Sequence, residues 1–443
     1  MNKILYLPVV RRKFDAKTAE TIRGQLSELL SAYDVIEPTE ALGDPTELAS
    51  FLSQVQEQDF AGIIFHNTTF TDAEFVKLVH RYYPEKPILL LAPREPSVHG
   101  WLHFNSLTGI VSSANYLHTQ KHYFQHIYGN PDEIFVQKKI QGFVKACLLK
   151  DKIANSKIGV VGTFPPGFFF SDADAVKLKA TFGITLKHYE IDEAFIAADA
   201  LQEAIYKKEL DYAAEHYQNL DINGKETIKF VKFVALMKQW AKRDGFSALA
   251  SRCWPDFFDK YGCAPGAVWT QLDNEQLPTA MECDIHGALS MYILQELTPN
   301  KAATYLGDLS SLDEEDNTIT MWHDYGAYDV ANPKYGIKAG VHPNRKMPVS
   351  PDAVLKPGKV TVMRVHYDTD GYKLVAFKGR ALDVEPQYNG FSGKIQLKQP
   401  VDKVVDNFIE SGYESHFALV YGDYVEDIAN LAKLLNIKCE IVD

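Results

Sequence analysis

The first 155 residues alternate continuous apolar runs with helical patterns, and this alternation constrains the fold more than any other feature. Apolar runs lie at residues 3–10, 61–67 and 87–93, and helical patterns lie between them at 16–32 and 72–83. Strands that are apolar along their whole length are typical of a parallel sheet covered by helices on both faces. No GxGxxG motif follows the first run and no GxxxxGK[ST] motif occurs, so nucleotide binding has no support.

The rest of the chain changes from one pattern to another near residue 320. A second strand and helix alternation begins with the run KIGVVGTF at 157–164, and short strands dominate after 320, with a hairpin turn at Asp370-Gly371. We predict an α/β protein with two doubly wound parallel-sheet domains and a β-barrel-like C-terminal domain. The predicted domains are 1–155 (N-terminal α/β), 156–318 (central α/β, carrying Glu282 and Asp308) and 319–443 (C-terminal, β-rich, carrying His416).

Composition excludes several classes of protein. The chain has 443 residues and a net charge of -12 without a basic stripe, so nucleic acid is not an expected partner. Its five cysteines show no CxxC spacing, which indicates neither a disulfide framework nor a structural zinc site. The apolar N-terminal run ILYLPVV is too short to span a membrane. We expect a soluble protein of the cytoplasm that binds no membrane.

The stretch from Leu277 to Ser290 is the strongest candidate for chemistry. It places three potential metal ligands, Glu282, Asp284 and His286, where a short apolar strand gives way to a helix. Open α/β sheets bind their ligands at the carboxyl ends of strands, which is where Glu282 would lie. The alternative is that the two carboxylates only complement the helix dipole.

Three further polar residues lie at the ends of predicted strands. Asp308 follows an apolar run, His323 follows the strand NTITM, and His416 precedes the strand HFALVYG. Carboxylates and histidines of this kind suit a hard divalent cation such as Mn²⁺ or Mg²⁺ better than a thiolate zinc site. The alternative for each residue taken alone is a hydrogen-bonded structural role.

Basic and aromatic side chains near other strand ends are candidates for substrate contact. Arg11 and Arg12 follow the first strand, Arg252 and Trp254 end the strand FSALASRCW, and Phe168 lies in an aromatic loop after KIGVVGTF. Cations at strand ends suit an anionic group, and aromatic rings suit the apolar face of a sugar. The alternatives are a solvated basic loop and packing against a partner subunit.

Taken together, these segments resemble the L-fucose isomerase and L-arabinose isomerase superfamily. The resemblance covers about the last 200 residues well and the first 150 only in layout. It rests on Cys253-Trp254-Pro255, Glu282-Cys283-Asp284 with Gly287-Ala288-Leu289, Asp308, Trp322-His323, and His416-Phe417-Ala418-Leu419-Val420 with Gly422-Asp423.

The resemblance implies a metal-dependent aldose-ketose isomerase that works through a cis-enediolate. It implies that Glu282, Asp308 and His416 hold the metal, with Mn²⁺ expected and other divalent cations as alternatives. Glu282 and Asp308 would then divide the acid and base work. His323 lies where arabinose isomerases have a further ligand, and we count it among the substrate-binding residues. A homo-oligomer with the site near a subunit interface is also implied.

The length of the chain narrows the expected substrate. Short members of this superfamily include isomerases of sulfoquinovose, a glucose analogue with a sulfonate at C6, and their length resembles that of this chain. A sulfonate needs fixed donors, which Arg11, Arg12 and Arg252 would supply. Three alternatives stay open: an isomerase of a neutral sugar such as L-fucose or L-arabinose, a non-catalytic sugar-binding protein, and a metal-dependent aldolase or lyase.

Overall fold

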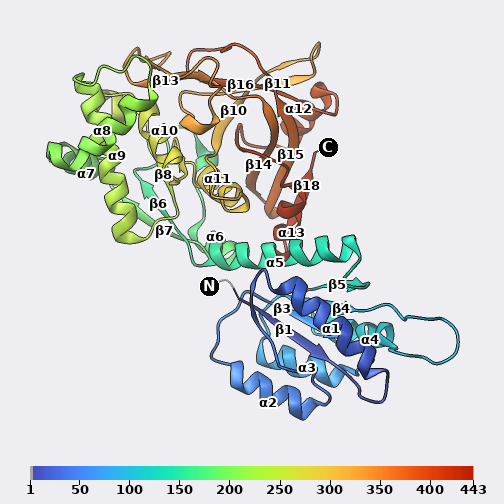
Figure 1. Ribbon diagram of the computed structural model, residues 1–443. Coiled ribbons are helices and arrows are strands. Elements are labelled where there is room, and N and C mark those ends of the chain that lie inside the picture. The colour runs from blue at the N-terminus through green and yellow to red at the C-terminus, as the bar shows by residue number, and fades with distance from the viewer. Residues whose placement is uncertain (1–2, 443) are drawn as a thin grey trace. The chain divides into compact units, whose positions relative to one another are not determined.

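The computed structural model describes residues 3–442, which form two compact units (Figure 1). Unit 1 contains the residues up to Lys152 together with Lys433–Asn436, and unit 2 contains Ile153–Ala432 and the residues from Ile437. The described residues contain no helix that is long and apolar enough to cross a membrane. The cytoplasmic location stays a prediction.

Unit 1 is built on a parallel sheet with strand order β2-β1-β3-β4-β5. Alternate residues of β1 enter different cores: Leu5 and Leu7 pack on one face, and Ile4 and Tyr6 on the other. Both faces are therefore covered by helices, as the continuous apolar runs predicted. The elements are β1 (Lys3–Val9), α1 (Ala16–Leu30), β2 (Asp34–Ile36), α2 (Pro45–Val55), β3 (Gly62–Asn67), α3 (Ala73–Tyr82), β4 (Ile88–Ala92), α4 (Ser106–Thr119), β5 (Phe124–Tyr128) and α5 (Ile134–Ala154).

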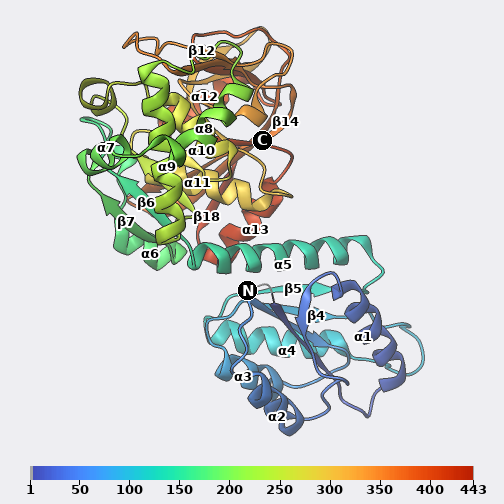
Figure 2. The same ribbon diagram turned by 60° about the vertical axis from the view of Figure 1, so that its left-hand side comes forward.

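Unit 2 begins with a second parallel sheet, of order β7-β6-β8-β9 (Figure 2). Two separate helices, α7 and α8, follow the strand β7, and the chain is extended at Gln202 between them. The elements are β6 (Lys157–Val161), α6 (Ala175–Phe182), β7 (Thr185–Tyr189), α7 (Ile191–Asp199), α8 (Glu203–His216), α9 (Lys225–Asp244), β8 (Ala248–Ser251), α10 (Gly266–Asn274), β9 (Thr279–Ala280) and α11 (Ile285–Leu297).

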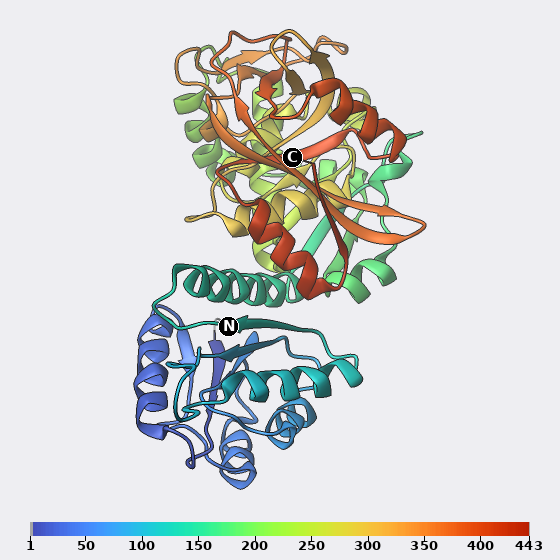
Figure 3. The same ribbon diagram turned by 90° about the vertical axis from the view of Figure 1, so that its right-hand side faces the viewer.

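The last part of unit 2 is a mixed sheet that closes on itself (Figure 3). Antiparallel pairing runs through β16-β11-β10-β17-β14-β15, and the pairing of Arg380 with Gln396 joins β15 back to β16. This closed ring confirms the predicted barrel-like character. The elements are β10 (Tyr305–Asp313), β11 (Thr318–His323), β12 (Lys338–Gly340), β13 (Ser350–Val354), β14 (Gly358–Asp368), β15 (Gly371–Ala381), β16 (Phe391–Gln396), α12 (Val401–Glu410), β17 (His416–Tyr421), α13 (Val425–Leu435) and β18 (Lys438–Ile441).

Helix α11 joins the two sheets of unit 2. Nearly all of its residues are buried, and it packs against β8 and β9 on one side and against β14 and β17 on the other. Asp308 lies on β10, in the barrel sheet, whereas the sequence predicted it within the central domain. The difference arises because β10 precedes the change of pattern near residue 320 yet pairs with β11 and β17. The three-domain division itself stays a prediction.

Candidate active site

Four of the predicted site residues, Trp254, Glu282, Asp308 and His323, line one cavity of unit 2, and His416 lies against Glu282 and Asp308. Glu282 follows β9, Asp308 lies on β10, His323 ends β11 and His416 begins β17. The cavity has a volume of about 490 Å³, a size typical of small-molecule sites. It is lined by Cys253, Trp254, Phe258, Pro265, Met281, Glu282, Asp308, Trp322, His323, Asp324, His342, Asn344 and Arg345.

A strained turn presents Glu282 to the cavity. Glu282 and Cys283 have φ angles of 58° and 56°, a left-handed conformation that costs a non-glycine residue about 1–2 kcal/mol. The backbone N–H of Cys283 donates to Ser251 O at 3.0 Å, which fixes the turn to β8. Trp254 Nε1–H donates to Glu282 Oε1 at 2.7 Å. Backbone strain of this kind is characteristic of functional sites.

His416 stands at the centre of the carboxylates. Its Nε2 lies 3.2 Å from Glu282 Oε2 and 3.5 Å from Asp308 Oδ1. Asp308 and His416 are directly opposite each other in the β10–β17 ladder, which explains their proximity. Burial alone would lower the pKa of His416, but hydrogen bonds to Asp284 and Glu282 raise it to about 10. The surroundings of Nε2 therefore favour a positive charge.

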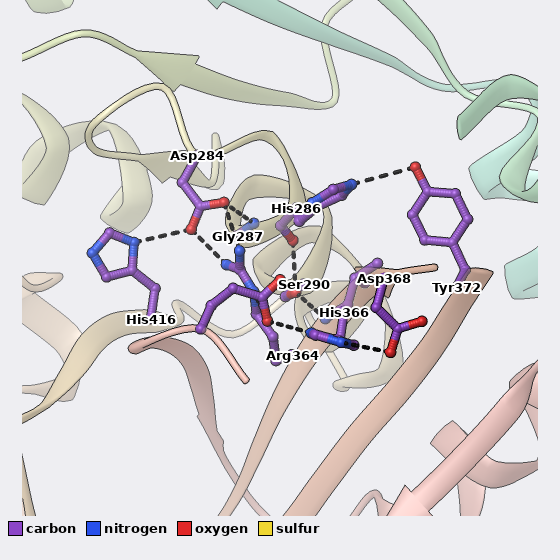
Figure 4. Close-up of polar contacts among 11 residues, drawn as sticks. Asp284, His286, Gly287, Ser290, Arg364, His366, Asp368, Tyr372 and His416 are labelled. Carbon is purple, nitrogen blue, oxygen red and sulfur yellow. Dashed lines mark hydrogen bonds and ion pairs between the residues drawn. The ribbon is translucent and has the colours of Figure 1, made fainter. Parts of the chain in front are cut away.

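Asp284 holds the other nitrogen of His416. Figure 4 shows Asp284 between His416 and Arg364, and its Oδ2 lies 3.0 Å from His416 Nδ1. Asp284 also caps α11 by accepting the Gly287 N–H at 2.8 Å. Only glycine fits there, since a Cβ on Gly287 would lie 2.4 Å from Asp284 Oδ2. Because Asp284 accepts a hydrogen bond from Nδ1–H, Nε2 is left to face Glu282 and Asp308.

A buried ion network supports Asp284 from behind. Arg364 is completely buried on β14 and donates to both carboxylate oxygens of Asp284, at 2.5 and 3.0 Å. Its Nε lies 3.6 Å from Glu414 Oε2, which in turn lies 2.7 Å from His366 Nδ1. Burial raises the pKa of Asp284, but Arg364 and His416 lower it well below its usual range. Asp284 is therefore a permanent anion behind His416.

His323 adds a further donor to the cavity. Its Nδ1 lies 2.8 Å from Asp324 Oδ1, while its Nε2 is buried and has no hydrogen-bond partner within residues 3–442. The potential ligand atoms of Glu282, His323 and His416 all lie within 4.8 Å of one another. This group contains His323 where the resemblance implied Asp308, although Asp308 also lies beside His416 Nε2. An unsatisfied imidazole nitrogen within 4.8 Å of ligand atoms of Glu282 and His416 fits a divalent cation.

The predicted aromatic loop lies beside these residues. The ring of Phe168 meets Trp254 edge-on at 5.5 Å, and Phe170 meets His416 in the same way at 5.1 Å. Trp254 in turn holds Glu282. The structure therefore places Phe168 next to the cavity-lining tryptophan, while its role in binding substrate stays a prediction.

The three arginines selected from the sequence are not among the residues that line the cavity. Arg252 forms an ion pair with Asp256 and donates to Thr163 Oγ1 at 3.0 Å. Arg11 and Arg12 belong to unit 1, where Arg11 pairs with Asp72 at 2.6 Å and Arg12 with Glu47 at 2.8 Å. Each guanidinium thus has a carboxylate partner of its own. Their contact with substrate stays a prediction.

Two arginines of the site, Arg364 and Arg345, were not selected from the sequence. Arg364 had a usable signal, because a charged residue interrupts the otherwise apolar run VTVMRV, and such a charge is buried only with a partner. Arg345 lies in the polar segment HPNRK, which carried no periodicity or strand end to mark it. The cavity lining, and not the sequence pattern, identifies it.

Comparisons with known proteins agree on one family. The family model described as "L-fucose isomerase, C-terminal domain" matches residues 350–442. A sulfoquinovose isomerase of Priestia megaterium (strain ATCC 12872 / QMB1551) is 38% identical over 99% of this chain and 98% of its own length. Those of Alkalicoccus urumqiensis and Clostridium sp. (strain MSTE9) are 37% and 34% identical, over 99% and 100% of this chain and 98% and 99% of their own lengths. The resemblance predicted from sequence is thus confirmed.

Proposed function

The chain belongs to the sulfoquinovose isomerase family and is an isomerase, and from this premise we propose that it converts sulfoquinovose into 6-deoxy-6-sulfofructose. Identities of 34–38% over nearly the whole length support the substrate. The observation that carries the chemistry is that Glu282 and Asp308, which line a cavity of suitable size, converge on one nitrogen of His416.

We propose that Glu282, Asp308 and His416 hold a divalent cation. Mn²⁺ is the expected ion, and other divalent cations are the alternatives. The donors are two carboxylates and an imidazole, with His323 Nε2 beside them, and this set suits Mn²⁺ or Mg²⁺ better than a thiolate metal. Such a cation supplies Lewis-acid stabilisation of the charge that develops on O1 and O2 of the sugar. Asp284 keeps His416 in the tautomer that this role requires.

The protein's own residues move the protons. We propose that one carboxylate of the pair Glu282 and Asp308 accepts the proton from C2 and returns it at C1. The other moves a proton between O1 and O2, so that the two groups share the acid and base work. Trp254 fixes Oε1 of Glu282, which keeps Oε2 directed at His416. Asp308 has the more exposed side chain, 31% against 10%, and is the group closer to solvent.

A metal-depletion assay tests this proposal. The protein is exhaustively chelated, restored with Mn²⁺, and assayed for ketose formed from sulfoquinovose, L-fucose, L-arabinose and glucose. We expect activity only after restoration, with the highest kcat/KM for sulfoquinovose. Full activity of the chelated protein would remove the metal from the mechanism. Equal turnover of the neutral sugars would favour the neutral-sugar isomerase instead, and absence of any ketose would favour a sugar-binding protein.

A labelling experiment tests the proton-transfer route. When the reaction runs in D₂O, a carboxylate that carries the C2 proton exchanges it with water, so the ketose is expected to contain deuterium at C1. The measurement is the deuterium content at C1 by NMR. Complete retention of the original C2 hydrogen at slow turnover would favour a hydride shift.

We also propose that the chain works as a homo-oligomer. In unit 1, the loop around residues 97–102 exposes Val98 and Trp101, each at 88%, and apolar groups this exposed often mark an interaction surface. Arg11 and Arg12 are candidates for groups donated to a neighbouring copy. Light scattering together with activity decides the question, since a fully active monomer would contradict the proposal.

A further inference from the structure

We propose that Arg345 binds the sulfonate of the substrate, an inference that rests on the proposed function and names the residue that selects for the anion. Among the described residues, Arg345 is the one lysine or arginine that lines the cavity. The same cavity is lined by the carboxylates of Glu282, Asp308 and Asp324. A sulfonate entering among these carboxylates needs a cation to hold its end of the sugar, since like charges repel it.

The loop that carries Arg345 is locally fixed. The N–H of His342 donates to Met347 O, and the N–H of Lys346 donates back to His342 O, both at 2.9 Å. Inside this loop, His342 Nδ1 accepts the N–H groups of Asn344 and Arg345, at 3.3 and 3.2 Å. The backbone of Arg345 is therefore held in place before a substrate arrives, which reduces the entropy lost on binding.

The side chain of Arg345 is also oriented. Its guanidinium carbon lies 5.5 Å from the centre of the Phe258 ring, and His342 meets the same ring edge-on at 4.9 Å. Stacking on an aromatic face supports the plane of a guanidinium while its N–H groups stay available. Within residues 3–442, Arg345 has no carboxylate partner, in contrast with Arg252, which is engaged by Asp256. Arg345 is thus the available cation.

His342 does not share this role. Because its Nδ1 accepts two backbone N–H groups, its proton lies on Nε2, which is 3.4 Å from Asp324 Oδ2. Burial lowers the pKa of His342, which keeps the ring neutral. Its contribution is to shape the loop, so the positive charge that this loop brings to the cavity lining belongs to Arg345.

The chemistry of the substrate matches this arrangement. A sulfonate is a permanent anion with three acceptor oxygens, and a guanidinium offers two parallel N–H donors to such a group. Asn344 lines the cavity beside Arg345 and adds an amide N–H. The reacting carbons C1 and C2 are at the opposite end of the six-carbon chain from the sulfonate, and the proposed function assigns them to Glu282 and Asp308. Arg345 accordingly acts on binding and selectivity, not on the proton transfers.

A matched set of variants tests the inference by steady-state kinetics. The substrates are sulfoquinovose and 6-deoxyglucose, which is the same sugar without the sulfonate. We expect R345A to lower the ratio of kcat/KM for sulfoquinovose to that for 6-deoxyglucose by about 10- to 100-fold, as for a lost hydrogen bond to a charged group. The loss should appear mainly in KM for sulfoquinovose. R345K should recover part of the ratio, because it keeps the charge and loses the fork.

Lys346 provides the control. It is the neighbouring exposed cation and does not line the cavity, so K346A should keep the wild-type ratio. An unchanged ratio in R345A, or an equal fall in K346A, would overturn the assignment. Thermal unfolding of each variant is measured to check that the variant is folded.

A further arm separates this inference from the function on which it rests. If the wild type does not convert sulfoquinovose, the proposed function fails. If it converts sulfoquinovose and R345A does so equally well, only the role of Arg345 fails. If the wild type has a higher kcat/KM for glucose 6-phosphate than for sulfoquinovose, and R345A lowers that kcat/KM by 10-fold or more, the anion contact stands and the sulfonate assignment fails.

Discussion

The sheet of unit 1 and the barrel end of unit 2 bury polar side chains in opposite ways. In unit 1, Tyr6 and His66 form a neutral pair, with Tyr6 Oη 2.8 Å from His66 Nδ1. Burial lowers the pKa of His66 from 6.5 to about 3, so the ring carries no charge near neutral pH. In unit 2, Asp284 and Arg364 are equally buried yet ionised, and Asp284 holds His416.

The difference shows what a buried charge requires. One hydrogen bond is enough for a neutral pair, whereas the Asp284 carboxylate interacts with Arg364, His416 and the Gly287 N–H at the same time. A buried ion pair contributes little net stability compared with apolar packing, so stability alone does not explain it. Its position behind His416 indicates a role in fixing the candidate metal ligand.

The largest effect on stability is expected from R364M. Methionine has a similar volume but leaves Asp284 buried without its cation, which costs about 3–5 kcal/mol of unfolding free energy. Urea unfolding followed by tryptophan fluorescence measures the loss. R81M, a change at an exposed arginine of unit 1, should alter stability by less than about 0.5 kcal/mol. If the double variant R364M/D284N regained no stability, the unpaired carboxylate would not be the cause.

The largest effect on activity is expected at the carboxylates that face His416. E282Q and D308N keep the shape of each side chain and remove its basicity, so kcat should fall by more than ~100-fold. Circular dichroism should show an unchanged fold. E314Q, which changes an exposed carboxylate near the end of the β10 strand, is the control and should retain full activity. Near wild-type rates in either site variant would exclude that carboxylate from proton transfer.

A smaller effect is expected when the support of His416 is weakened. D284N replaces the carboxylate behind Nδ1 by an amide, and changes of this kind reduce metal affinity by about 10- to 100-fold. Isothermal titration of the chelated protein with Mn²⁺ measures the affinity directly. H286Q changes a buried neighbour on the same helix that is outside the group of potential ligands, and it should bind Mn²⁺ as the wild type does. If D284N and the wild type bound Mn²⁺ with equal affinity, Asp284 would not support His416 as a metal ligand.

A further effect, which depends on pH, concerns the neutral histidine of unit 1. The folded-state pKa of His66 is about 3 and lies below 6.5, so between these values the unfolded chain binds more protons. Stability should therefore fall as the pH falls through this window, by up to about 1.4 kcal/mol per pH unit. Unfolding measured from pH 7 to pH 4 should show a shallower dependence for H66F than for wild type. H126Q, at an exposed histidine, should leave the slope unchanged.

The sequence correctly predicted those features that depend on local patterns. The buried runs at 61–67 and 87–93 became β3 and β4 because apolar periodicity is a property of neighbouring residues. The short strands β2 and β5 escaped prediction because they are brief and only partly buried. Glu282, Asp308 and His416 were selected from strand ends and a family resemblance, and the structure places all three at one cavity wall or beside it.

The sequence by itself determined the α/β class, the family and the residues at which strands end. The tertiary structure alone decided which charges meet. Arg11 and Arg12 were selected from the sequence as substrate contacts, and the structure pairs them with Asp72 and Glu47, 61 and 35 residues away. Likewise, Asp284 reaches His416 across 132 residues. The partner of a charged side chain is a long-range contact, and the periodicity of strands and helices does not encode it. The burial pattern is a local property, so the order of residues along the chain predicts it.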